Sequence, residues 1–138
     1  MSTVDAQSDV ESGHGGRKVL VIDDSATIRQ AATLLLKENN YDVVVAEDGF
    51  SGLSACAEHK PDIALIDVMM PRIDGFQACA LIRNSEEFNQ LPIIMLTSKD
   101  SEFDKAKAKL VGANEYVTKP FDREEFLSAI ARAMEIEQ

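Results

Sequence analysis

Short apolar runs that stop at a charged or hydroxyl residue recur along this chain and constrain its fold more than any other feature. The clearest is Ile63-Ala-Leu-Ile66, which ends at Asp67 and is followed by the turn-forming residues Pro71 and Gly75. Four consecutive apolar residues are typical of a strand buried on both faces, as in a parallel sheet covered by helices. Asp67 is therefore predicted to leave the carboxyl end of a buried strand, where ligands bind in open α/β sheets.

Four further segments have the pattern of strands, and a helical pattern follows each of the five. These segments are residues 19–22, 41–46, 91–96 and 115–118. Two of the helices begin with pairs that resemble a capping box, Ser101 with Asp104 and Asp122 with Glu125. Five strands alternating with five helices predict an α/β fold with a doubly wound parallel sheet and right-handed crossovers.

Length and composition fit one domain of this kind. Residues 1–16 have no periodic apolar order, so we expect a disordered leader before a single domain over residues 17–138. The formal net charge is −10, with 14 Lys and Arg against 24 Asp and Glu, which argues against nucleic-acid binding. Apolar runs are too short for membrane insertion, and no secretory leader is evident, so we expect a cytoplasmic protein. Cys56 and Cys79 lack redox or zinc spacing and are expected to be free, buried thiols.

Side chains with related chemistry follow several of the predicted strands. Asp23 and Asp24 follow the first strand, Asp67 the third, and Thr97 and Lys119 the last two. Taken singly, each has an ordinary structural explanation, since Asp24 could cap a helix and Lys119 could be a solvated surface amine. The carboxyl ends of parallel strands meet at one edge of a sheet, so their joint placement favours a functional site.

The chemistry of this set points to phosphoryl transfer. Three carboxylates crowded at one edge repel one another unless a cation joins them. Mg²⁺ prefers oxygen ligands and is usually held by one or two carboxylates together with phosphate. A carboxylate such as Asp67 can act as a nucleophile towards phosphoryl groups. Thr97 could donate a hydrogen bond to the phosphoryl oxygens, and Lys119 could balance their charge.

From Lys18 to about Met134, the chain resembles the receiver domains of two-component response regulators. Five separated motifs occur in the family's order: Asp23-Asp24-Ser25, Asp67, Met70-Pro71-x-x-Asp74-Gly75, Thr97-Ser98 and Lys119-Pro120-Phe121. The resemblance implies a flavodoxin-like receiver fold, in which five parallel strands have the order 2-1-3-4-5. It also implies a cis peptide bond between Lys119 and Pro120.

The same resemblance implies a role for each residue of the site. Asp67 would be the phosphoacceptor, and Thr97 and Lys119 would contact the phosphoryl group. The ligands of Mg²⁺ would be Asp23 (chiefly through water), Asp24, Asp67 and the main-chain carbonyl of Met69. Tyr116 would be the aromatic switch residue that changes rotamer together with Thr97.

A receiver would take its phosphoryl group from a histidine kinase of the chemotaxis type and would not be an enzyme beyond self-catalysed transfer and autodephosphorylation. Only residues 135–138 follow the last helix, so we expect signalling by protein contact. The target would bind the face formed by the helix after Ser101, the strand at residues 115–118 and the last helix. A basic patch there would suit an acidic partner, and its residues would be Lys105, Lys107 and Lys109.

Within the family, the chain is most similar to stand-alone regulators of type IV pilus twitching motility. The similar segments are residues 21–29, 79–82, 97–100 and 103–107. This similarity implies a role in pilus or chemotaxis-like motility control.

Two other classes of protein have a site or a topology related to the one predicted here. A haloacid-dehalogenase-like, Mg²⁺-dependent phosphatase also has an Asp nucleophile at a strand end, but its Asp-x-Asp signature is missing from Asp67-Val-Met69 and from Asp24-Ser-Ala26. This phosphatase is the alternative function. A flavin-binding module shares the predicted topology, but acids line these loops where phosphate-binding Gly, Ser or Thr would be expected.

Overall fold

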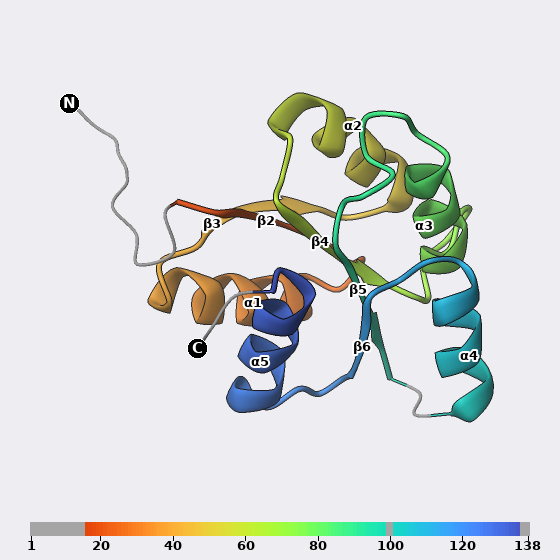
Figure 1. Cartoon of the computed structure of the whole chain (residues 1–138). Helices are drawn as coiled ribbons and strands as arrows, with labels where there is room; N and C mark the ends of the chain where they lie inside the picture. Colours follow the sequence, from red (N-terminus) through yellow and green to blue (C-terminus); the bar gives the residue numbers. More distant parts are fainter. Residues whose placement is uncertain (1–15, 99–100, 136–138) are drawn as a thin grey trace.

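The computed structural model describes residues 16–98 and 101–135 (Figure 1). Strands and helices alternate along the chain, as predicted. They are β2 (Lys18–Ile22), α1 (Ala26–Glu38), β3 (Asp42–Ala46), α2 (Gly49–His59), β4 (Ile63–Asp67), α3 (Gly75–Arg83), β5 (Ile93–Thr97), α4 (Glu102–Leu110), β6 (Glu115–Thr118) and α5 (Arg123–Ala133). Apart from Gly16, the predicted leader lies outside the described residues, as do residues 136–138 at the other end.

The five strands form one parallel sheet in the order β3-β2-β4-β5-β6. Counted along the chain, this is the order 2-1-3-4-5, so the implied fold class is confirmed. β4 lies at the centre, and all five of its residues are buried. The carboxyl end of this central strand is where Asp67 leaves the sheet.

Helices cover both faces of the sheet, with α1 and α5 on one side and α2, α3 and α4 on the other (Figure 1). Alternate residues of each strand point to opposite faces, which divides the core into two clusters. Leu20, Ile66 and Met95 belong to the cluster beneath α2, α3 and α4. Val21, Leu65 and Leu96 belong to the cluster beneath α1 and α5. The continuous apolar strands follow from this double burial.

Each helix begins with a side-chain cap. The capping residues are Ser25, Asp48, Asp74, Ser101 and Asp122, and each accepts a hydrogen bond from a backbone N–H three residues further on. The predicted starts at Ser101 and Asp122 are confirmed. Cys56 and Cys79 are free and buried, as expected. Among the described residues, no helix has the length and apolar character needed to cross a bilayer.

Candidate functional site

The ends of β2 and β4 bring three aspartates together at one edge of the sheet. One carboxylate oxygen from each of Asp23, Asp24 and Asp67 lies within 4.8 Å of the others. Asp23 is fully buried, Asp67 is 2% exposed and Asp24 faces solvent. The backbone holds this arrangement, since Asp23 N donates to the carbonyl of Ala46 in the neighbouring strand at 3.1 Å. The acids therefore converge, as their strand-end positions predict.

Lys119 lies between two of these acids. Its Nζ is 3.1 Å from Asp23 Oδ2 and 3.1 Å from Asp67 Oδ1. Its main-chain N–H donates to the carbonyl of Thr97, and the peptide bond to Pro120 is cis, as the resemblance implies. Burial lowers the pKa of Lys119, but hydrogen bonds to Asp67 and Asp23 outweigh burial and leave that pKa above its ordinary value. The ammonium group is thus held charged inside the site.

Lys119 nevertheless does not fully compensate the negative charge of Asp67. Burial, followed by repulsion from Asp23, raises the pKa of Asp67 to about 6, although the hydrogen bond from Lys119 lowers it. One ammonium group cannot balance two buried carboxylates. An all-oxygen donor set with excess negative charge fits a hard divalent cation such as Mg²⁺. Met69 follows closely in the loop, and its N–H donates to Asp67 Oδ1 at 3.2 Å.

We expect Asp67→Asn to stabilise the metal-free protein at pH 7.5. The folded-state pKa of about 6 lies above the ordinary 3.8, so stability contributed by this group falls as the pH rises between these values. A shift of this size corresponds to at most about 3 kcal/mol. That pKa already includes the attraction of Lys119, so we expect a gain of about 1–3 kcal/mol in the free energy of unfolding.

Urea denaturation in EDTA at pH 7.5 and pH 4.5 measures this gain. It should be smaller at the lower pH, where Asp67 of the parent is protonated. The exposed Asp42→Asn is a matched control and should leave stability nearly unchanged. A less stable Asp67→Asn protein at pH 7.5 would show that the carboxylate is not strained by its surroundings.

Thr97 and Tyr116, the two predicted switch residues, lie on neighbouring strands. Thr97 is fully buried at the end of β5 and faces Thr118 in the register, while Tyr116 faces Met95. Tyr116 thus lies two residues before the end of β6, whereas Thr97 is the last residue of β5. Met95 and Thr97 are two residues apart and therefore share a face of the sheet. Tyr116 is paired with Met95, so the side chains of Thr97 and Tyr116 both lie on the side that α3 and α4 cover. Tyr116 packs against the core cluster on that side.

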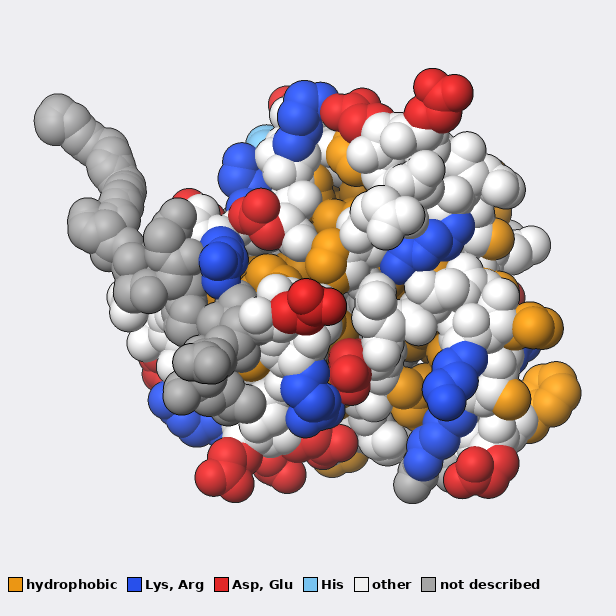
Figure 2. All heavy atoms as spheres, in the orientation of Figure 1, with side chains coloured by type: hydrophobic (Ala, Val, Ile, Leu, Met, Phe, Trp, Pro, Cys, Tyr) orange, Lys and Arg blue, Asp and Glu red, His pale blue; other side chains and the backbone are white. Residues whose placement is uncertain are grey.

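An open cavity of about 340 Å³ lies between α4 and β6, lined by Tyr116, Lys105 and Lys109 among others. Lys107 does not line this cavity, and its Nζ lies 4.9 Å from the centre of the Phe76 ring on α3. The expected patch of three lysines is therefore wrong. Residues two apart in a helix point about 200° apart, so α4 separates Lys107 from the other two. Figure 2 shows basic side chains beside hydrophobic atoms over α4 and β6.

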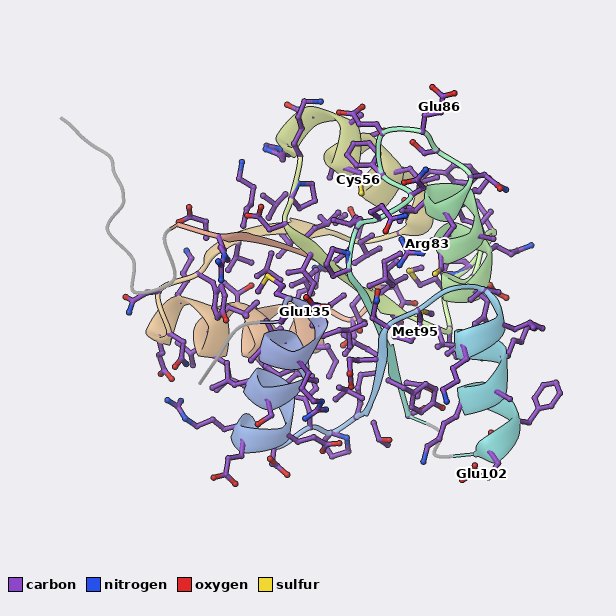
Figure 3. The ribbon with its side chains drawn as sticks, in the orientation of Figure 1. Cys56, Arg83, Glu86, Met95, Glu102 and Glu135 are labelled. Carbon is purple, nitrogen blue, oxygen red and sulfur yellow. The ribbon has the colours of Figure 1, made fainter. Side chains whose placement is uncertain are left out.

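Several contacts in the structure were not anticipated from the sequence. Asp74 and Gln77 form a complete capping box at the start of α3, which the spacing Asp74-x-x-Gln77 could have revealed. Arg29 donates to the carbonyl of Asp23 at 2.6 Å. Arg83 reaches from α3 to the loop before β6, where its Nε donates to the carbonyl of Gly112 at 3.0 Å (Figure 3). Arg83 and Gly112 are 29 residues apart, so their contact leaves no local sequence signal.

A doubly wound parallel sheet with an acidic cluster, a buried threonine and a lysine at one edge defines a receiver domain. The family model of the response regulator receiver domain matches residues 19–131, and the chain belongs to this family. Receiver domains in general accept phosphoryl groups from histidine kinases on an aspartate and bind Mg²⁺ at an acidic site. These comparisons lend no support to the alternative phosphatase.

Among individual relatives, Protein PilG of Pseudomonas aeruginosa is 53% identical over 121 residues, which cover 88% of this chain and 90% of PilG. Chemotaxis protein CheY4 of Vibrio cholerae has a similar structure, with a TM-score of 0.81 and 35% identity over 85% of this chain and 98% of its own. The receiver domain of a sensor histidine kinase from Pseudomonas aeruginosa PAO1 aligns with a TM-score of 0.80 and 28% identity, over 87% of this chain and 98% of its own. That structure has a magnesium ion coordinated in its active site cleft.

Proposed function

We propose that this protein is a response regulator in which Asp67 accepts a phosphoryl group from a histidine kinase in the presence of Mg²⁺. The observation that carries the proposal is the contact of Lys119 with both Asp23 and Asp67, beside a third carboxylate from Asp24. A receiver of this kind works in the cytoplasm and carries out only its own phosphorylation and dephosphorylation.

In the transfer step, an Asp67 carboxylate oxygen attacks the phosphorus of a phosphohistidine. A P–O bond forms as the P–N bond breaks, and the electron pair of that bond stays with the imidazole. Lys119, held 3.1 Å from Asp67 Oδ1, balances charge on the phosphoryl oxygens, and the Thr97 hydroxyl donates a hydrogen bond to one of them. Mg²⁺, when bound, neutralises further charge during transfer.

Asp23, Asp24 and Asp67 would hold Mg²⁺, and the resemblance to receivers adds the main-chain carbonyl of Met69. Asp23 is partly engaged, because its carboxylate accepts hydrogen bonds from Ser25 N at 2.9 Å and from Lys119. This supports a mainly water-mediated role for Asp23, whereas the exposed Asp24 is available for direct coordination.

Acetyl phosphate provides a test that needs no kinase. With Mg²⁺, intact-mass spectrometry should detect one phosphoryl group per chain, and a chase with fresh buffer should show its slow loss. Removal of the metal with EDTA should abolish uptake, because the repelling carboxylates then lack their counter-ion. Uptake that is equally fast in EDTA would refute the metal-dependent site.

We also propose that the protein acts in pilus-based twitching or chemotaxis-like motility. The support is the 53% identity to PilG over most of both chains, together with the similar motifs in the sequence. The downstream partner would bind at α4, β6 and α5. In that face, Lys105 and Lys109 flank the cavity beside Tyr116 and would attract an acidic segment of the partner.

Phosphorylation should be transmitted to that face through Thr97. When beryllofluoride mimics the phosphoryl group, Thr97 would move towards Asp67 and vacate space for the Tyr116 ring. Hydrogen exchange of α4 and β6 should therefore change in the parent on addition of the mimic, by at least about fivefold at the most responsive amides.

Thr97→Ala should lose most of this exchange response, while the neighbouring, exposed Ser98→Ala should keep it. Both variants should still bind the mimic at Asp67. A full exchange response in Thr97→Ala would show that the signal reaches α4 by another route.

A further inference from the structure

The loop between β4 and α3, residues 68–74, is held in an unusual backbone geometry. Arg72 in this loop has φ = 70°, a left-handed conformation that is uncommon for residues other than glycine. Such conformations persist when their surroundings impose them. The loop begins directly after Asp67, and Met69 N within it donates to Asp67 Oδ1. Its geometry therefore bears directly on the acidic site.

The Arg72 side chain supplies one such constraint. Its Nη2 donates to Asp48 Oδ2 at 2.7 Å, and the guanidinium carbon lies 5.6 Å from the centre of the Phe50 ring. Asp48 is itself fixed, because its other oxygen caps α2 by accepting from Ser51 N at 2.7 Å. The loop is thus tied to the rigid first turn of α2.

The next residue strengthens the same attachment. Ile73 packs so closely on Gly49, the first residue of α2, that a Cβ at Gly49 would lie 2.5 Å from Ile73 Cγ1. Two consecutive loop residues therefore contact three consecutive residues at the start of α2. Arg72 forms its ion pair with Asp48, outside the cluster of three aspartates, so any effect on that cluster passes through the loop.

We propose that Arg72 is a positioning residue of the phosphoacceptor site. Its contacts with Asp48 and Phe50 hold the loop in the left-handed geometry that places the backbone of Met69 beside Asp67. The inference rests on the proposed function, because Met69 is there assigned a metal-ligating carbonyl. Loss of the Arg72 guanidinium should loosen the loop, weaken Mg²⁺ binding and slow phosphoryl uptake.

Loss of this positioning role should have little effect on the free energy of unfolding of the whole protein. The Arg72 side chain is 60% exposed, and exposed ion pairs contribute little to the free energy of unfolding. The ion pair between Arg123 and Glu38 offers a control, since its atoms are 2.9 Å apart and Arg123 is about as exposed as Arg72, but the pair joins α5 to α1 away from the loop. Arg123→Gln should therefore change neither the loop nor the metal affinity.

Two substitutions remove the charge pair with little other change. Asn tolerates left-handed backbone, so Arg72→Asn removes the guanidinium while keeping the turn accessible. Asn also caps helices as well as Asp, so Asp48→Asn removes the charge while keeping the start of α2. Hydrogen exchange of residues 69–74 in metal-free protein and Mg²⁺ titration by calorimetry are the two measurements.

Each variant should exchange about two- to fivefold faster in the loop and bind Mg²⁺ weaker by a similar factor, the range that an exposed pair can supply. Asp48→Asn removes only the ion pair, whereas Arg72→Asn also removes the contact with Phe50, so the double variant should show little change beyond Arg72→Asn alone. If Arg72→Asn matches Arg123→Gln in loop exchange and in Mg²⁺ affinity, the positioning role is refuted. If the parent itself binds no Mg²⁺, the proposed function fails, whereas the exchange data still decide whether Arg72 holds the loop.

Discussion

Asp67→Asn protein should carry no phosphoryl group after incubation with acetyl phosphate and Mg²⁺, whereas the parent should carry one. An amide is a far poorer nucleophile than a carboxylate and cannot form the acyl phosphate. Asp23 and Asp24 should not accept the phosphoryl group in place of Asp67. Asp23 is fully buried and accepts a hydrogen bond from Lys119, while Asp24 is placed to bind the metal. Intact-mass spectrometry, followed by mapping of the modified peptide, measures the difference.

Asp74→Asn is the matched control for this experiment. Asp74 ends the loop that follows Asp67 and caps α3, a role that Asn fills equally well, so this variant should be labelled like the parent. The urea denaturation of Asp67→Asn described above tests whether misfolding contributes to a loss of label, and we expect that variant to be folded. Stoichiometric labelling of Asp67→Asn at a different residue would remove Asp67 from its proposed role.

Gly75→Ala should be the most destabilising of the substitutions considered, with a loss of about 2–3 kcal/mol in the free energy of unfolding. A Cβ at Gly75 would collide with the main-chain oxygen of Asp67 and lie 2.9 Å from Met95 Cε. The carbonyl belongs to the central strand and cannot move aside, and Gly75 N is hydrogen-bonded to the carbonyl of Val68 at 2.9 Å. The same clash would displace Asp67 and slow phosphoryl uptake.

Gly49→Ala is a matched comparison, because Gly49 is also the first residue of a helix and also follows an aspartate cap. Its Cβ would meet the Ile73 side chain, which is only partly buried and can shift more easily than a strand carbonyl. Urea denaturation should therefore show a smaller loss for Gly49→Ala. Equal stability of Gly75→Ala and the parent would contradict the close approach of α3 to β4.

Local sequence patterns were sufficient to predict the strands, the helices and the edge of the sheet to which Asp67 belongs. A doubly buried strand needs a continuous apolar run, and a chain that alternates such runs with amphipathic helices forms a parallel sheet. The acids at two strand ends could then be expected to meet. The strand order came from the resemblance to receivers, because periodicity carries no information on which strands are neighbours.

The separation of the lysines of α4 follows from the geometry of the helix. Lys105 and Lys109 are four residues apart and share a helix face, whereas Lys107 lies on another face, over Phe76. The position of Tyr116 opposite Met95 needed the register of β5 and β6, which the sequence alone did not provide.

By itself, the sequence determined which residues gather at the site, because strand ends and helix caps follow from neighbours along the chain. Only the tertiary structure decided how those residues interact. Burial beside Asp23 raises the pKa of Asp67, and Arg72 meets Asp48 from a position 24 residues away. Such effects depend on solvent exclusion and on distances between segments that are remote in sequence, and no local pattern of residues encodes them.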